Sequence, residues 1–149
     1  MRHVTGTPMD GAEITEYLDS HWRGVLCFGT PDGGHGTAVS FAYDAKTRKL
    51  YFRLAGGPDD RKPSFVDDGE RVTLVSYDRT DGDHETVVAE GRLEAVAESA
   101  LGSTVRQSVE DLKLPTVGVF GQSSDHEAFR LVSLDIDSVS GRREAAAYT

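Results

Sequence analysis

Cysteine occurs once in the chain, at Cys27, so no disulfide can form within it. The residue sits in the apolar run 25–28, which favours a buried structural thiol over a nucleophile. Long apolar runs are missing as well. No segment could span a bilayer, and the N-terminal MRHVTGTPMD has no apolar signal core. We therefore expect a cytoplasmic protein that does not associate with membranes.

Lysine is scarce, with four residues in the chain, and the formal net charge is −9 at pH 7. No basic stripe exists that could displace counterions, which argues against a nucleic-acid partner. Most of the acids are aspartate. An Asp-rich, Lys-poor surface is typical of proteins from salt-loaded, halophilic cytoplasms, and an ordinary acidic protein remains the alternative.

Alternating apolar and polar residues predict six strands, most of them joined in hairpins by turns rich in Gly, Pro and Asp. The pattern is that of a mainly β protein with short helices (α+β), folded as a six-stranded antiparallel barrel. Gly91 lies inside the fifth strand and predicts a bulge or bend there. The predicted strands are residues 24–29, 36–43, 49–54, 71–77, 86–96 and 129–136.

Three short helices complete the predicted fold. The first begins after Asp10, whose side chain could form a capping box with Glu13. The others are expected over residues 63–69 and 98–112. We expect one domain over residues 1–149, with a core from 10 to 139 and a flexible tail from 140 to 149.

The second predicted strand has two unlike faces. Thr37, Val39, Phe41 and Tyr43 lie on one side, whereas the other side carries only small residues. A small face could pack tightly against another element, or it could let a flat ligand lie close to the backbone. The small residues are Ala38, Ser40 and Ala42.

Two adjacent cations, Arg61 and Lys62, follow the glycine-containing turn 55–60. Arginine presents a planar fork of donors and lysine a point charge, and both suit a phosphate. Ser64 adds a hydroxyl, and the first turn of a helix adds backbone N–H groups. The alternative is a solvated pair that balances the neighbouring aspartates.

The order of these elements resembles the FMN-binding split-barrel family, whose best-known member is pyridoxamine 5′-phosphate oxidase. The resemblance covers about residues 10–139. It rests on Thr37-Ala38-Val39-Ser40-Phe41, on Tyr51-Phe52-Arg53, on Arg61-Lys62 after the turn, and on residues 87–96.

The resemblance implies a homodimer with FMN in clefts between two barrels. Carried over by position, the isoalloxazine ring would lie along Ala38, Val39 and Ser40 of the second strand. Phe52 and Arg53 of the third strand would flank the ribityl chain. The phosphate would be held after the turn by Arg61, Lys62 and Ser64.

Two departures from the family pattern narrow the expected activity. Asp59 and Asp60 lie next to the proposed phosphate cations, and the chain has no basic, extended C-terminus that could grip a phosphorylated substrate. Arg142-Arg143 is the nearest such feature. We therefore do not expect pyridoxamine phosphate oxidation itself. Relatives in the family also bind deazaflavin or haem, so deazaflavin is the alternative cofactor.

Three functions fit this pattern: an FMN-dependent oxidoreductase acting on an unknown small molecule, a flavin- or deazaflavin-binding module without turnover, and a cofactor-free interaction domain. No general acid or base is evident, and His35 and Tyr77 are the nearest candidates. The five histidines are scattered, so no metal site is predicted. No Gly-x-Ser-x-Gly motif of a serine hydrolase occurs.

Overall fold

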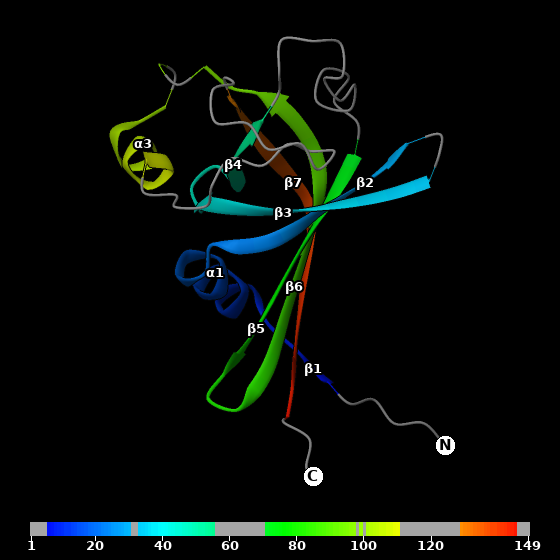
Figure 1. Cartoon of the computed structure of the whole chain (residues 1–149). Coiled ribbons are helices and arrows are strands. Elements are labelled where there is room, and N and C mark those ends of the chain that lie inside the picture. The colour runs from blue at the N-terminus through cyan, green and yellow to red at the C-terminus, as the bar shows by residue number, and fades with distance from the viewer. Residues whose placement is uncertain are drawn as a thin grey trace.

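The computed structural model describes residues 6–30, 33–55, 71–97, 99, 101–110 and 129–145. Seven antiparallel strands form one sheet in the order β1-β7-β4-β3-β2-β5-β6, and β7 also pairs with β6. This last pairing closes strands β2 to β7 into a barrel (Figure 1). The predicted six-stranded antiparallel barrel is therefore confirmed, with β1 as a short addition. The elements are β1 (Gly6–Pro8), α1 (Gly11–Ser20), β2 (Arg23–Thr30), β3 (Gly33–Asp44), β4 (Lys49–Ala55), β5 (Arg71–Thr80), β6 (Asp83–Ala95), α3 (Ser103–Glu110) and β7 (Phe129–Glu144).

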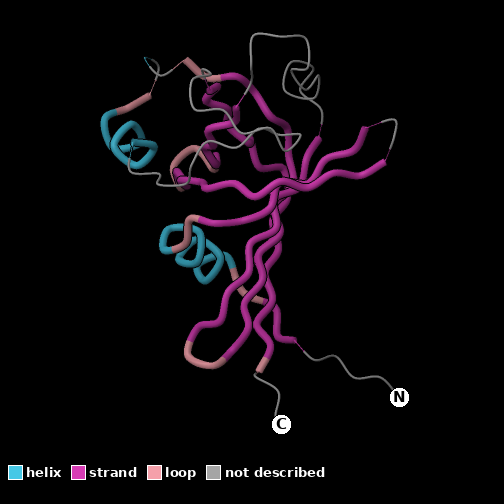
Figure 2. Tube along the Cα trace, viewed as in Figure 1, coloured by secondary structure: helices cyan, strands magenta, loops and turns pink. Residues whose placement is uncertain are grey.

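The barrel is open towards one end, where a long arm leaves it. The β5–β6 hairpin and the second half of β7 run together below the barrel, and β1 lies along the same side (Figures 1 and 2). The arm is possible because β7 changes neighbours along its length. Its first half pairs with both β4 and β6, whereas its second half pairs with β6 and finally with β1.

The predicted flexible tail was wrong for residues 140–144. The strand predicted over 129–136 continues to Glu144, and each of these residues pairs with β6. The sequence of residues 140–144, SGRRE, lacks the apolar alternation that identifies a strand. Backbone pairing and the ion pair between Arg143 and Glu85 hold it instead.

The connection between the strands predicted over 71–77 and 86–96 is also shorter than those bounds imply. Asp81 and Gly82 form a two-residue turn, with φ angles of 53° and 87°. Positive φ at both central residues is the geometry that a two-residue hairpin requires, and Asp-Gly is a preferred sequence for it. Strands β5 and β6 therefore extend up to this turn.

The first helix forms as predicted. Asp10 Oδ1 accepts from the Glu13 backbone N–H at 2.8 Å, and Glu13 Oε1 accepts from the Asp10 N–H at 2.9 Å. The apolar face of α1 packs against the core of the barrel through Ile14, Tyr17 and Leu18. The predicted helix over 98–112 is confirmed over Ser103–Glu110, and the predicted helix at 63–69 lies outside the described residues.

The buried apolar residues of the described part of the chain form two clusters. The larger one fills the barrel and includes Leu26, Phe41, Phe52 and Leu134, together with the face of α1. The smaller one lies on the outer surface of β4 and β7, where Tyr51 and Leu131 pack against Val109 of α3. Because α3 covers this outer surface, the sheet there is buried on both faces.

The predicted bulge at Gly91 is confirmed by a register shift between Glu90 and Gly91 in the β6–β7 pairing. A Cβ atom at this position would lie 1.9 Å from the Asp135 carbonyl oxygen, so only glycine fits. Cys27, by contrast, is half-buried and not fully enclosed as expected. Within the described part of the chain, no helix is long and apolar enough to cross a bilayer.

Candidate functional site

Strand β3 presents its small side chains on the outside of the barrel. Val39 and Phe41 point into the core, and the pleat of the strand therefore sends Ala38 and Ser40 to the opposite, outer face. Ala38 is exposed, whereas Ser40 is 7% exposed. The predicted Ala42 shares this face, and the face continues towards the start of the strand through Gly36 and Gly34. The outer face of β3 consequently carries no side chain larger than serine over this stretch.

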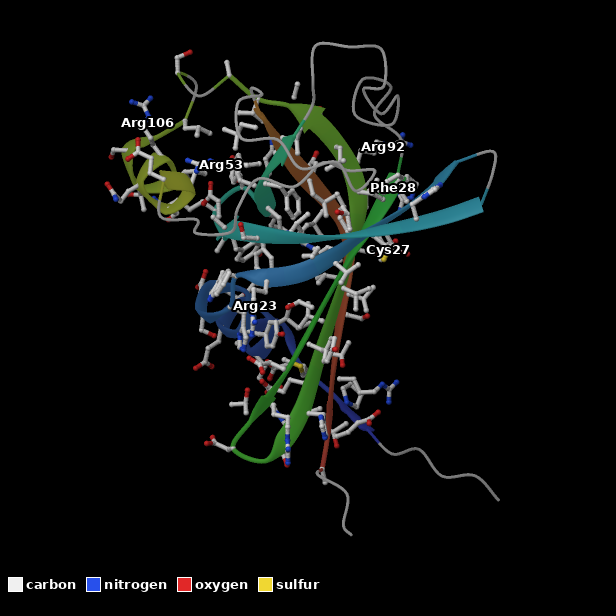
Figure 3. The ribbon with its side chains drawn as sticks, viewed as in Figure 1. Arg23, Cys27, Phe28, Arg53, Arg92 and Arg106 are labelled. Atoms are coloured by element: carbon white, nitrogen blue, oxygen red, sulfur yellow. The ribbon has the colours of Figure 1, made fainter. Side chains whose placement is uncertain are left out.

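Strand β4 adds a cation to that face. Phe41 of β3 pairs with Phe52 of β4, and Phe52 is fully buried in the core. The next residue, Arg53, therefore lies on the outer face, where it is half-buried and pairs with Leu131 of β7. Figure 3 shows its side chain beside α3. Ser40 and Arg53 flank the Phe41–Phe52 pair, so the small face and the guanidinium adjoin.

The predicted cofactor residues thus divide into three groups. Ala38, Ser40 and Arg53 share the outer face. The side chains of Val39 and Phe52 are buried in the barrel, so a ligand on the outer face could reach only their backbone. Arg61, Lys62 and Ser64 lie outside the described residues.

A cavity of about 600 Å³ opens beyond the last small residue of β3. Its walls come from the end of α1 and from α3, and its floor comes from the end of β3. Sequence reasoning missed it, because α3 is distant in the chain and its sequence shows only an amphipathic pattern. The lining residues are Leu18, Asp19, Ser20, His21, Trp22, Phe41, Ala42, Tyr43, Thr104 and Ser108.

His21 caps the end of α1 and is held on both sides. Its ring stacks on Tyr17 with centroids 3.7 Å apart, and its Nδ1 lies 2.8 Å from the Tyr17 carbonyl oxygen. Its Nε2 lies 3.4 Å from Asp78 Oδ2. A carbonyl oxygen can only accept, so Nδ1 carries a proton in this arrangement.

A buried hydroxyl pair fixes α1 to the barrel next to this histidine. Ser76 Oγ donates to the Arg23 carbonyl at 2.7 Å, so the Tyr17 hydroxyl donates to Ser76 Oγ at 2.9 Å. Burial raises the pKa of Tyr17. The end of α1 is therefore held rigidly where it borders the cavity.

The two candidate catalytic residues do not join this group. His35 pairs with Phe28 in the β2–β3 hairpin, and their rings stack 5.6 Å apart. Tyr77 is 72% exposed on β5. The strand register places neither residue opposite Arg53. Within the described ranges, no group of three or more His, Cys, Asp or Glu residues could hold a metal ion.

The family follows from a comparison with known sequences. A model of the pyridoxamine 5′-phosphate oxidase family matches residues 10–143. The chain belongs to this family. The match includes the predicted resemblance at 10–139 and extends it into the second half of β7. A comparison with curated proteins gives no match.

Solved structures of similar fold cover nearly the whole chain. A conserved protein of unknown function from Corynebacterium diphtheriae has a TM-score of 0.68 at 21% identity, and 95% of this chain and 100% of that chain are covered. A FAD-binding protein from Mesorhizobium loti has a TM-score of 0.67 at 17% identity, with 95% and 100% covered. A FAD-binding protein from Mycobacterium smegmatis has a TM-score of 0.59 at 16% identity, with 92% and 98% covered. At these identities the likeness establishes the shared fold.

Proposed function

We propose that this protein is a flavoprotein that binds FMN against the outer face of β3 and β4. The observation that carries the proposal is the continuous small face from Gly34 to Ala42, which adjoins the half-buried Arg53. A planar ring needs such a face in order to lie on the backbone, and a phosphorylated chain needs cations at one end. Two proteins of the same fold are FAD-binding proteins, which supports a flavin.

Each residue would have a distinct role in holding the cofactor. Ala38 and Ser40 would leave room for the isoalloxazine ring, and Val39 and Phe52 would fix the two strands through the core. Arg53 would donate to oxygens of the ribityl chain. Arg61, Lys62 and Ser64 are proposed to hold the phosphate, on the sequence pattern alone. A bound flavin supplies hydride or single-electron transfer, and the protein supplies its position.

The first experiment is an absorption spectrum of the purified protein after incubation with FMN and removal of unbound flavin by gel filtration. We expect about one flavin per chain. Mass spectrometry of the released cofactor distinguishes FMN from FAD and from deazaflavin. Ala38→Phe places a large ring on the exposed small face and should abolish retention, while circular dichroism should show an intact fold. Retention that is unchanged in this variant would contradict the proposed position.

The phosphate residues are tested by Arg61→Ala with Lys62→Ala, which should weaken FMN retention at least tenfold. The matched control is Lys46→Ala with Arg79→Ala, which removes the same charges from exposed positions in two hairpins. Equal losses in both double variants would indicate a general charge effect and not a phosphate site.

We further propose that the protein is an oxidoreductase with a small-molecule substrate. Anaerobic addition of NADH or NADPH to the flavin-loaded protein should bleach the flavin absorption, and air should restore it. Bound flavin that no donor reduces would favour a binding module without turnover. A folded protein that retains no flavin of any kind would favour an interaction domain.

The family resemblance also leads us to propose a homodimer. Val25 is 39% exposed on the outer face of β2, opposite Ala38 of β3 and Val75 of β5. Val75 and its neighbour Val88 of β6 are half-buried. This valine face (Val25, Val75 and Val88) adjoins the small face of β3. A second copy would cover the valine face and complete the cleft for the flavin.

A further inference from the structure

We propose that the cavity between α1, β3 and α3 is the substrate site, and that it takes a planar aromatic ring carrying no negative charge. The role as substrate site rests on the proposed flavin chemistry, whereas the binding of such a ring does not.

The position follows from strand geometry. Ala42 borders the cavity and lies on the same outer face of β3 as Ser40, two residues further along. Two residues of an extended strand span roughly 7 Å. A ring in the cavity would thus lie beside a flavin bound over Ala38 and Ser40. The volume of about 600 Å³ is that of a site for a small ligand.

The walls are unusually aromatic. Among the ten described residues that line the cavity, three are Trp22, Phe41 and Tyr43, whereas aromatic residues make up 8% of the whole chain. Trp22 is 44% exposed, so its ring is accessible to a ligand. The Arg23 guanidinium lies 5.2 Å from the centre of the Trp22 ring and already makes a cation–π contact with it.

The charged groups around the cavity disfavour the binding of an anionic ligand. Among the described residues that line it, none is lysine or arginine, and Asp19 contributes an exposed carboxylate. His21 does not supply a free positive charge, because its two ring nitrogens face the Tyr17 carbonyl and the Asp78 carboxylate. The Ser108 hydroxyl is occupied as well, since it donates to the Thr104 carbonyl at 3.2 Å. Arg23 contacts the Trp22 ring but does not line the cavity, so a phosphorylated or carboxylated ring would find no lysine or arginine among the described lining residues.

Three probes with the same pyridine ring test this selectivity: nicotinate is anionic, nicotinamide is neutral and N1-methylnicotinamide is cationic. Calorimetric titration of the full-length protein should give dissociation constants for the neutral and cationic probes at least tenfold below that of nicotinate. Trp22 is the only tryptophan, so its fluorescence should change with the same saturation curve. Equal or tighter binding of nicotinate would overturn the proposal, as would quenching that never saturates.

Variants locate the site and its charge preference. Asp19→Asn should weaken the cationic probe about two- to fivefold, the range expected for one exposed charge. Glu16→Gln removes the same charge from an exposed position of α1 that does not line the cavity, and it should have no effect. Identical behaviour of these two variants would contradict the assignment. Ala42→Leu should weaken all three probes by filling the cavity, and Ser108→Leu does so from α3 if the first variant is unstable.

The flavin experiments are read separately. Retained flavin without saturable ring binding would refute this inference and leave the proposed function standing. Saturable ring binding without flavin retention would keep the ring site and remove its role as a substrate site.

Discussion

At the scale of single residues, Gly91 is a position where the fold accepts only glycine. A Cβ there would meet the Asp135 carbonyl oxygen at 1.9 Å, and a backbone atom within a paired strand cannot move aside. We expect Gly91→Ala to lower the free energy of unfolding by about 3 kcal/mol or more. Urea denaturation measures this value.

Gly141 provides the matched control for Gly91. A Cβ at Gly141 would approach Met9 Sδ at 2.9 Å and Ile14 Cγ1 at 3.0 Å, and both are side-chain atoms that can shift. Gly141→Ala should therefore lower the free energy of unfolding by only about 1 kcal/mol. A loss at Gly141 as large as that at Gly91 would contradict this account of the bulge.

Tyr17 gives a prediction about alkaline pH. Burial raises its pKa in the folded protein above the ordinary value of 10.0. The folded state therefore holds the Tyr17 proton more tightly than the unfolded state does. The stability that Tyr17 contributes in this way is complete below pH 10 and declines as the pH rises towards the folded pKa. Tyr17→Phe should lower the free energy of unfolding by about 1 kcal/mol at pH 7, through the lost hydrogen bond to Ser76.

The test compares the two proteins across pH. The stability difference between wild type and Tyr17→Phe should shrink above pH 10, as measured by urea denaturation at each pH. Tyr77→Phe removes a hydroxyl from an exposed ring and is the control, expected to leave the stability unchanged. A difference that stays constant with pH would show that Tyr17 does not titrate with folding.

Local sequence signals were sufficient to predict some features of single residues. The Asp10–Glu13 capping box and the Gly91 bulge were predicted, because each depends on neighbours in the chain or on a single special residue. The placement of Ala38 and Ser40 on the face opposite Val39 and Phe41 followed from the period of the strand. The burial of Cys27 was wrong because its run of apolar residues does not reveal which face of the sheet is covered.

At the scale of elements, Arg143 joins three segments that the sequence does not connect. Its guanidinium donates to Glu85 Oε2 of β6 at 2.7 and 2.9 Å, and to Glu13 Oε2 of α1 at 2.9 Å. The backbone hydrogen bond from Asp10, followed by the bond from Arg143, lowers the pKa of Glu13. The end of β7 is thereby fixed to the first turn of α1.

The lowered pKa predicts how this junction responds to acid. A carboxyl whose pKa is lower in the folded state contributes stability above its ordinary value of 4.5, and this contribution is lost as the pH falls through the folded pKa. Glu13→Gln should be less stable than wild type at pH 7, and the difference should decrease below pH 4.5. Thermal unfolding at pH 7 and at lower pH checks this. Glu16→Gln, on an exposed position of the same helix, should unfold at the wild-type temperature at pH 7.

The end of β7 also shows why some predicted boundaries of strands were wrong. Residues 140–144 have no apolar alternation, and their strand exists because β6 and β1 lie on either side of it. Long-range pairing of this kind has no local sequence signal. The two-residue turn at Asp81–Gly82 had one, the Asp-Gly pair, although the surrounding acids concealed it.

At the scale of the whole molecule, the order of strands was sufficient to predict the barrel, since hairpins leave few ways to connect six short strands. The cavity was not predictable in the same way. It needs α3 to fold back over β4 and β7, through the contacts of Val109 with Tyr51 and Leu131, and these residues are far apart in the chain. A site between elements depends on packing that the pattern of any one element does not contain.

The proposed dimer is the prediction that concerns the molecule as a unit. Light scattering after gel filtration should give twice the chain mass of 16.2 kDa. A stable interface needs about 800 Å² from each partner, and an apolar centre without charges. Val25→Glu places a charge in the valine face and should yield monomers.

Ala45→Glu makes the same kind of change at an exposed position in the turn between β3 and β4, and it should remain a dimer. A wild-type monomer at high concentration would refute the dimer, and dissociation of both variants would place the effect outside the valine face. Because Val25 pairs with Ala38, the monomeric Val25→Glu protein should also lose FMN while its barrel stays folded. A monomer that retains FMN with wild-type affinity would mean that one chain alone completes the cofactor cleft.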